Sequence, residues 1–581
     1  MTVTRLKTQP TRGNQDLIFL TLAAAVGALG SVARTGFVFG VKNNLFPLPI
    51  VVSLYDEPQF VHDPFIQSLH FFASGIWLIF SGVGRVINPY WLFLALDYLS
   101  RFIAFAGFLL CADILGVHTR IQRTLFVGIL CMTFLMQGTS YAGSGGLFIE
   151  YFTHSEVANG VTLFMLYFIV RGQLMWAIAM NGLVFFINAF VAVWNIVPLA
   201  AITIFLILKR EIIWRKFLLE GIIGLALAGL LTAPVIYNVI LNPEYGKRVD
   251  FSYIFFLRHY FPWHFLFSSI PTTQKIEAAI VVLLALLSLM ALKLPARPFL
   301  LALAGYVLVY TVGIAIPQFI DNPAILNLHL LRVSTMFHLL AALGTTALVT
   351  RWLTSDEMLI EKFLAVVTML LLCVNRHSFM VVPSILFVAL WLAGKRWVPT
   401  TIMESGIRFD YIVMVCLLII WPYPVWWQAV QNRHETEWVS EWSAVGQWAR
   451  LNTPIDALFL VPIVGDDFFA STTDNLQRSK LGASSTPLLG GGDDSGIFEF
   501  ASHRRVWVDW KEGAAVMWSP SYYYIWWPRM SAVVGLGSHD ERIDYAQKNG
   551  IGYVVEICGN GEMPSPIFRT RRLCLFAVPQ A

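Results

Sequence analysis

Acidic residues and a histidine lie close together in a proline-rich stretch near the start of the chain. Residues 41–65 contain Asp56, Glu57, His62 and Asp63, and prolines stand at positions 47, 49, 58 and 64. Proline fixes φ and removes a backbone donor, so this stretch is not a regular helix. A carboxylate held rigidly here can act as a general base, or can orient a metal or an acceptor hydroxyl. Asp63 is the candidate catalytic base, with His62 beside it. The alternative is that Asp56 and Asp63 cap short helices.

A second group of ionisable residues lies in residues 139–156. Glu150, His154 and Glu156 stand at positions i, i+4 and i+6, and the first two would share a helix face. If this group faced the first one, the two could hold a phosphate or a divalent metal such as Mg or Mn. No cofactor is certain from the sequence. The alternative is a solvated loop with a helix N-cap at Ser155.

Two cationic stretches could recognise an anion at the membrane edge. Arg332 follows the sequence LNLHL at the end of an apolar stretch, and its guanidinium suits a lipid-linked phosphate because it binds oxygens bidentately. The alternative is that Arg332 extends toward lipid headgroups. Residues 241–275 add further cations, including Arg248, and aromatic neighbours. They either bind an anionic headgroup or anchor the chain at the interface.

Other polar residues favour structural interpretations. Asp97 and Arg101 are four positions apart in an apolar stretch, which predicts an ion pair that Arg34 could join. Cys558 and Cys574 lie in or beside two expected strands, and we expect them to form a disulfide. Two acidic pairs, at 466–467 and 493–494, lie in turn-like stretches and are expected to be solvated. No nucleotide-binding motif is present in the sequence.

The composition limits the class of protein that carries these residues. Of 581 residues, 57% are hydrophobic and only 13% are charged. A soluble domain usually has about 25% charged residues. This excludes a soluble enzyme, a nucleic-acid binder and a disordered scaffold, and indicates a polytopic α-helical membrane protein. Membrane lipids are therefore expected partners and nucleic acid is not.

Apolar stretches long enough to cross a hydrocarbon core of about 30 Å recur along most of the chain. We expect about 13 spans, at residues 17–40, 89–113, 122–138, 157–171, 173–189, 191–208, 217–240, 276–292, 298–317, 331–350, 362–375, 378–394 and 409–428. Residues 66–84 are also apolar, but we expect them to lie in the outer interface, where Phe71, Phe72, Trp77 and Phe80 would be favourable.

Basic residues are more frequent in alternate loops, which predicts a cytoplasmic N-terminus. An odd number of spans then places the C-terminal part outside the membrane. From residue 431 the composition becomes more polar, and short apolar runs at 457–461, 505–510, 551–557 and 573–578 predict strands. Helices are expected at 435–451 and 540–549. The predicted organisation is a transmembrane domain, 1–430, and a soluble α/β domain, 431–581.

Several short motifs resemble a known group of proteins. They are FIVRGQLMWAIAMNGLVFFINAF at 168–190, LNLHLLRVST at 326–335, WARLNTPIDALFLVP at 448–462 and FASHRRVWVDWK at 500–511, together with Leu48-Pro49 through Asp63-Pro64-Phe65. With these motifs, the order of segments resembles the GT-C superfamily of membrane glycosyltransferases, in particular a group of uncharacterised bacterial GT-C-like membrane proteins.

The resemblance implies a sugar transfer from a polyprenyl-phosphate-linked donor to a glycan, lipid or protein acceptor. It would take place on the outer face of the bacterial cytoplasmic membrane. By position, Asp63 is similar to the superfamily's catalytic base and Arg332 to the residue that contacts the donor phosphate. The second loop departs from the pattern, because it offers Glu150 and Glu156 instead of a clear Asp pair. A non-catalytic scaffold or assembly subunit, or a transporter of a lipid-linked substrate, are the alternatives.

The predicted topology can be tested at the C-terminus. A reporter that is active only in the cytoplasm, fused after Ala581, should be silent, because charge bias and an odd number of spans both place this end outside. The same reporter fused before Met1 serves as the positive control. A bright C-terminal fusion would invert the topology.

Overall fold

A computed structural model describes residues 14–260, 262–355, 359–374, 382–394, 409–463, 496–558 and 564–579. The two acidic pairs at 466–467 and 493–494 lie outside these residues. Each of the thirteen stretches expected to be membrane spans overlaps a helix of the described residues. These helices are α1 (Asn14–Thr35), α5 (Pro89–Ile114), α6 (Arg120–Met132), α7 (His154–Val170), α8 (Leu174–Ile187), α9 (Ala189–Leu208), α10 (Trp214–Leu241), α13 (Thr272–Ala291), α14 (Arg297–Ala315), α16 (Ser334–Leu353), α17 (Leu359–Val374), α18 (Val382–Gly394) and α19 (Phe409–Ile420).

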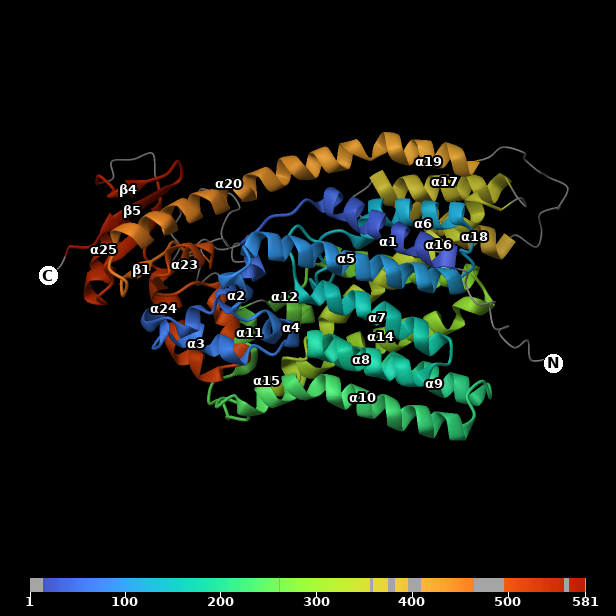
Figure 1. Cartoon of the computed structure of the whole chain (residues 1–581), viewed down its shortest axis with the longest axis horizontal. Helices are drawn as coiled ribbons and strands as arrows, with labels where there is room; N and C mark the ends of the chain where they lie inside the picture. The colour runs from blue at the N-terminus through green and yellow to red at the C-terminus, as the bar shows by residue number, and fades with distance from the viewer. Residues whose placement is uncertain are drawn as a thin grey trace.

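These helices form a bundle with nearly parallel axes, which Figure 1 shows lying along the long axis of the molecule. Within the described residues, eight helices are long and apolar enough to cross a membrane, or nine if one bent pair forms a single span. Several others, such as α6 with 13 residues and α8 with 14, are shorter than the roughly 20 residues that a span needs alone. The chain is therefore a polytopic helical membrane protein, and the exact number of spans stays a prediction.

The loops predicted to lie outside meet at one end of the bundle. Lys42 contacts Glu150 at 2.6 Å and Glu435 at 3.3 Å, and so joins the first two outer loops to the C-terminal part. The predicted inner segments meet each other as well. Arg123 contacts Asp16 at 3.9 Å. The loops therefore alternate between two ends as predicted, while the end that faces the cytoplasm stays a prediction.

Residues 66–84 do not cross the bundle. Two helical pieces, Pro64–Phe71 and Gly75–Arg85, are bent by 108° relative to each other. The start of the segment contacts Tyr55 through Gln67, and its end contacts Asp56 through Arg85. Trp77 was expected at the membrane interface, but it is only 2% exposed and donates a hydrogen bond to His154. It belongs to the protein interior, because residues 139–156 fold back over it.

Short helices and turns connect the long helices at this outer end. The first loop contains α2 (Pro47–Val52), α3 (Pro64–Ser68) and α4 (Gly75–Phe80), as its prolines suggested. The later loops contain α11 (Tyr253–His259), α12 (Pro262–Phe265) and α15 (Pro323–Leu326). Of these helices, α2 and α3 contact the C-terminal part, and α11 meets it through Phe256, whose ring lies 6.1 Å from that of Trp526.

The C-terminal part is an α/β domain that begins on a helix shared with the membrane region. Helix α20 (Pro422–Asn452) runs without a break through the predicted boundary at residue 431 and through the helix predicted at 435–451. The predicted boundary therefore falls inside a continuous helix, and the division into two domains stays a prediction. Figure 1 shows α20 reaching from the bundle to the sheet. The other helices are α23 (Gly496–Ser502), α24 (Tyr523–Val533) and α25 (His539–Lys548), the last as predicted.

The sheet has the strand order β2-β1-β3-β5-β4. Its strands are β1 (Leu458–Leu460), β2 (Arg505–Val506), β3 (Tyr553–Ile557), β4 (Phe568–Arg569) and β5 (Leu573–Ala577). Strand β1 is parallel to β2 and β3, whereas β5 is antiparallel to β3 and β4. The strand expected at 505–510 is shorter, because residues 511–517 turn into a 3-10 helix. Strand β4 was not predicted.

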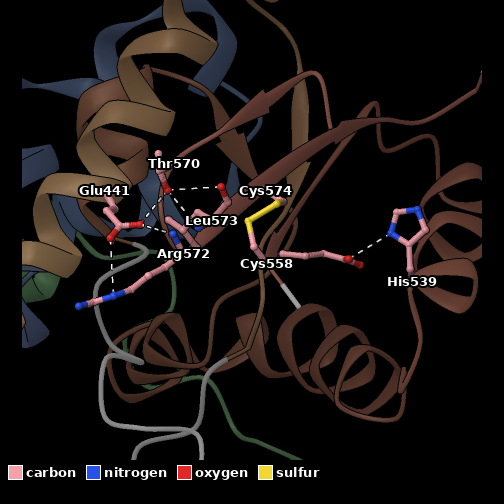
Figure 2. Close-up of a disulfide and its surroundings, with 8 residues drawn as sticks. Glu441, His539, Cys558, Thr570, Arg572, Leu573 and Cys574 are labelled. Carbon is pink, nitrogen blue, oxygen red and sulfur yellow. Dashed lines mark hydrogen bonds and ion pairs between the residues drawn. A yellow bond between two sulfur atoms is a disulfide. The ribbon is translucent and has the colours of Figure 1, made fainter. Parts of the chain in front are cut away.

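The predicted disulfide between Cys558 and Cys574 is confirmed. Their Cα atoms are 5.2 Å apart, and the bond joins the end of β3 to its antiparallel neighbour β5 (Figure 2). Glu441 on α20 accepts hydrogen bonds from the Thr570 hydroxyl and the Arg572 backbone nitrogen. The disulfide and Glu441 together fix the β-hairpin against α20.

A buried ionic network joins three helices near the outer end. Arg101 is fully buried on α5 and lies 3.4 Å from Asp97, as predicted, and 3.4 Å from Glu156 on α7. Its guanidinium also donates to the hydroxyls of Ser31 and Thr35 on α1, both at 2.9 Å. The same guanidinium donates to the carbonyl of Ile149. Arg34, which the sequence placed near this pair, donates to the carbonyl of Pro424.

Replacing Arg101 with Met should strongly destabilise the protein, because Asp97 and Glu156 would remain buried without their cation. Removal of one partner of a buried ion pair costs about 3–5 kcal/mol. Thermal unfolding of the protein in detergent should show a clearly lower Tm. The matched control is Arg85→Met, which breaks an exposed pair with Asp56 and should cost about 0–1 kcal/mol. Equal Tm values for the two variants would contradict the central role of Arg101.

Candidate functional site

Arg332 lies at the outer end of α16 among three histidines. A short 3-10 helix, Leu330–Val333, places Arg332 directly before α16, and His329 precedes this turn with φ of 51°. Arg332 interacts electrostatically with His154, His264 and His329. We call these four residues the Arg332 cluster. They come from α7, from α12 and from the turn before α16, so only the folded bundle brings them together.

The hydrogen bonds around the Arg332 cluster show which of its nitrogen atoms have a partner. Trp77 Nε1 donates to His154 Nδ1, so the proton of neutral His154 lies on Nε2. His264 Nδ1 lies 3.0 Å from the carbonyl of Gly143, to which it donates. Among the described residues, Nε of Arg332 and Nδ1 of His329 are buried and have no hydrogen-bond partner. The hydrogen-bonding capacity of these two atoms is therefore not used by the described part of the protein.

The Arg332 cluster carries the positive charge of Arg332. Across the described ranges, no ion pair joins Arg332 to an Asp or Glu. Burial, reinforced by the charge of Arg332, lowers the pKa of His264 to about 3, so His264 is neutral at pH 7. A buried guanidinium is costly unless it meets an anion or water. The geometry therefore suits an anionic ligand such as a phosphate.

Asp63 caps a helix in the first loop. Its Oδ1 accepts hydrogen bonds from the backbone nitrogens of Phe65 and Ile66, both at 3.0 Å, at the start of α3. The alternative that Asp63 is an N-cap is thus confirmed. Within the described residues, these two bonds use only Oδ1, so the cap leaves Oδ2 for another role. Burial raises the pKa of Asp63 above its usual value, although the two backbone donors and nearby arginines oppose this shift.

Carboxylates from the C-terminal domain lie next to Asp63. Glu499 on α23 is 2% exposed, and its Oε2 has no hydrogen-bond partner. Glu512 accepts a hydrogen bond of 2.8 Å from the hydroxyl of Tyr522. Burial, with a further contribution from neighbouring carboxylates including Asp63, raises the pKa of both Glu499 and Glu512 well above the usual value. These groups favour their neutral forms in the folded protein.

No hydrogen bond or ion pair joins Asp63 to Arg332 in the part of the chain that the structure describes. A series of aromatic contacts instead leads from one to the other. Phe65, in the helix that Asp63 caps, lies 6.3 Å from Phe46, which stacks on Phe72 at 5.9 Å. Phe72 in turn meets His154 at 5.8 Å. The prediction that Asp63 and Arg332 face one cavity therefore stays a prediction.

The other predicted site residues are dispersed. Glu156 belongs to the Arg101 network, and Glu150 is paired with Lys42. His62 and Arg248 are both exposed. The two acidic groups of the outer loops do not meet, and the described residues contain no group of three or more His, Cys, Asp or Glu side chains arranged to hold a metal.

Sequence reasoning missed several residues of this region. His154 was noted only for its spacing from Glu150, and His264 only as one of several cations. Glu499 and Glu512 were not singled out. His154 and His264 are 60 or more positions along the chain from Arg332, and Glu499 and Glu512 are more than 400 positions from Asp63, so no local sequence pattern predicts these neighbours. The sequence did contain one indication of His264. Two histidines, 259 and 264, lie near Trp263 in the loop after α10, and such a group could have been examined as a ligand-binding site.

Comparisons with known proteins give one structural similarity to report. No protein-family model matches the chain, and no curated protein matches it. The chain is similar to a crystal structure of ArnT from Cupriavidus metallidurans bound to undecaprenyl phosphate, with a TM-score of 0.39 and 12% sequence identity. The alignment covers 98% of this chain and 99% of that chain.

The buried carboxylates next to Asp63 predict a pH-dependent stability. Because the folded-state pKa values of Glu499 and Glu512 are raised, their contribution is fully present below the unfolded value of about 4.3 and is lost as pH rises through the folded values. Glu499→Gln, which is always neutral, should reduce the fall in Tm as pH increases. The control is Asp540→Asn on exposed α25, which should keep the wild-type slope. Parallel curves for Glu499→Gln and wild type would contradict the assignment.

Proposed function

We propose that this protein is a GT-C-type glycosyltransferase of the bacterial cytoplasmic membrane. It would move a sugar from a polyprenyl-phosphate-linked donor to a glycan, lipid or protein acceptor on the outer face. The observation that carries the proposal is the Arg332 cluster, where a half-buried arginine has no ion pair with a carboxylate among the described residues. The sequence resemblance described above supports the same activity.

Arg332 would bind the phosphate of the donor. Its position at the end of α16 allows the polyprenyl chain to extend along the membrane while the phosphate stays at the surface. His154 has its Nε2 proton available to donate, because its Nδ1 accepts from Trp77. As the glycosidic bond breaks, negative charge grows on the leaving phosphate. A fixed guanidinium and imidazole donors lower the barrier to that step.

Asp63 would accept the proton of the acceptor hydroxyl. Its raised pKa makes it a better proton acceptor near neutral pH than an ordinary aspartate. The cap holds the carboxylate through Oδ1 and leaves Oδ2 for the acceptor. The donor sugar would then lie along Phe72 and Phe46, between the phosphate and the first loop. His62, beside Asp63, is exposed and could contact the acceptor.

A non-catalytic scaffold or assembly subunit is the second candidate. It is favoured by the dispersal of Glu150 and Glu156 into ion pairs and by the absence of a metal-type cluster among the described residues. In this case Asp63 serves only as a helix cap. The two candidates differ in what a substitution of Asp63 does to sugar transfer.

Replacing Arg332 with Ala should weaken binding of a polyprenyl phosphate. A hydrogen bond to a charged group contributes about 1.5–3 kcal/mol, so we expect a loss of affinity of roughly tenfold or more. Binding is measured by the increase of Tm with lipid concentration in detergent. The matched control is Arg351→Ala, at the other end of the same helix, which should keep full affinity. Equal binding of the lipid by both variants would contradict the assignment of Arg332 to the donor site.

Replacing Asp63 with Asn should abolish sugar transfer in cells and leave donor binding unchanged. Asn also caps helices, so the fold should be preserved. The loss of a general base typically lowers the rate by about 10²–10⁴. Asp56→Asn, in the same loop but exposed and paired with Arg85, should retain activity. Full transfer by Asp63→Asn, with normal donor binding, would favour the scaffold.

A further inference from the structure

Helix α10 presents a lipid-facing side that continues onto the C-terminal domain. Only 11% of the most apolar segment of α10 is buried inside the protein, so most of this helix faces lipid. The chain that follows α10 is bound to the C-terminal domain. Asn242 donates to the carbonyl of Trp518 at 2.7 Å, and Glu244 accepts from the backbone nitrogen of Ser521 at 3.0 Å. The start of α24 therefore lies beside the membrane-edge end of α10.

Further ring contacts bind α24 to the same loop. Phe251 stacks on Tyr523 with centroids 3.9 Å apart, and Phe255 meets Trp527 edge-on at 5.9 Å. Figure 1 shows this part of the C-terminal domain beside the loop that follows α10. Helix α24 is thus held at the height where the lipid-facing helices end.

Large aromatic side chains are exposed along this edge. Tyr237 at the end of α10 is 65% exposed, and Tyr245 in the following loop is 64% exposed. Phe255 on α11 is 44% exposed, Tyr524 on α24 51%, and Phe319 after α14 83%. We call these five residues the aromatic collar. Scattered exposed apolar residues need no explanation. These five, however, belong to segments that end at the same membrane edge.

The charges beside the aromatic collar are mixed. Arg248 and Arg258 are exposed, and so is Asp250, while Lys247 is paired with Glu244. The side chains of Phe319 and Phe255 carry no hydrogen-bonding group, so contact with lipid is more favourable for them than contact with water. Tyrosine carries a hydroxyl on an apolar ring, and such residues are enriched where a protein crosses the headgroup level of a bilayer.

We infer that the aromatic collar is a bilayer-docking surface: it lies in the headgroup layer, and through Tyr524 it seats the C-terminal domain on the membrane. The occupant is the lipid leaflet on the side of this domain. Continuity with the lipid-facing side of α10 supports this occupant over a protein partner. The exposed Arg248 and Arg258 would contact lipid phosphates. The inference is independent of the proposed enzymatic activity.

The test uses the full-length protein in nanodiscs, where both leaflets and the C-terminal domain are accessible. A Cys416→Ser background removes the one partly exposed free thiol and leaves the disulfide intact. Tyr524→Cys and, separately, Phe319→Cys are labelled with an environment-sensitive fluorophore. The matched control is Leu451→Cys, which is 84% exposed near the distal end of α20. The discs contain phosphatidylcholine and phosphatidylglycerol, with or without a nitroxide on the lipid headgroup.

Both collar positions should be quenched several-fold more by the headgroup nitroxide than position 451 is. Aqueous iodide should quench position 451 more strongly than either collar position. If iodide quenches position 524 as strongly as position 451, and the nitroxide does not, the surface faces water and the inference is wrong. If both quenchers fail at position 524 while size-exclusion shows a larger assembly, a protein partner or second copy covers it, and the inference is equally wrong.

Discussion

The outer half of the structure depends on how one buried cation is satisfied. Arg101 lies in the middle of an apolar bundle with no exposed surface, where an unpaired guanidinium would be strongly unfavourable. Its partners are two carboxylates, two hydroxyls and two backbone carbonyls, and they come from α1, α5, α7 and the loop before α7. Satisfying this one side chain therefore fixes three helices and one loop together.

That loop connects the ionic network to the candidate site. The backbone N–H of Ile149 donates a hydrogen bond to the Glu156 carboxylate, and its carbonyl accepts one from Arg101. Both backbone polar groups of Ile149 are therefore bound by the ionic network. The residues between Ile149 and Glu156 include Glu150, which reaches Lys42, and His154, which belongs to the Arg332 cluster. The position of the imidazole that faces Arg332 is thus set by an ion network on the opposite side of the loop. A site of this kind is rigid because its supporting residues are buried.

The sequence predicts those parts of the fold that follow from local pattern. Each apolar stretch expected to span the membrane overlaps a helix, although α20 extends well beyond the stretch that ends at residue 428. The spacing of Asp97 and Arg101 predicted their ion pair, and the strand-like runs around Cys558 and Cys574 predicted the disulfide. The candidate site was only partly predictable. Arg332 was found from its position at a helix end, but its histidine neighbours come from other segments. Asp63 and Glu499 are neighbours although more than 400 positions of sequence separate them, because the C-terminal domain folds back onto the first loop. Strand β4 was not predicted because its two residues, 568–569, are too few to show a strand periodicity.

The contact between the first loop and the C-terminal domain bears directly on the role of Asp63. If the domain were only a soluble appendage, Asp63 would be a solvated helix cap with an ordinary proton affinity. Instead, Trp518 donates to Ser68 in the helix that Asp63 caps, and Tyr522 packs against Phe65 in the same helix. This packing buries Asp63, and burial favours its protonated form, whereas the two backbone donors and the nearby Arg505 and Arg529 oppose the rise in its pKa. A helix cap gains nothing from a raised pKa, because its hydrogen bonds favour the ionised carboxylate. Perturbed pKa values are frequent at functional sites, so the opposition between burial and helix capping supports the proposal that Asp63 transfers a proton. The C-terminal domain contributes to this opposition, because it packs on the helix that Asp63 caps.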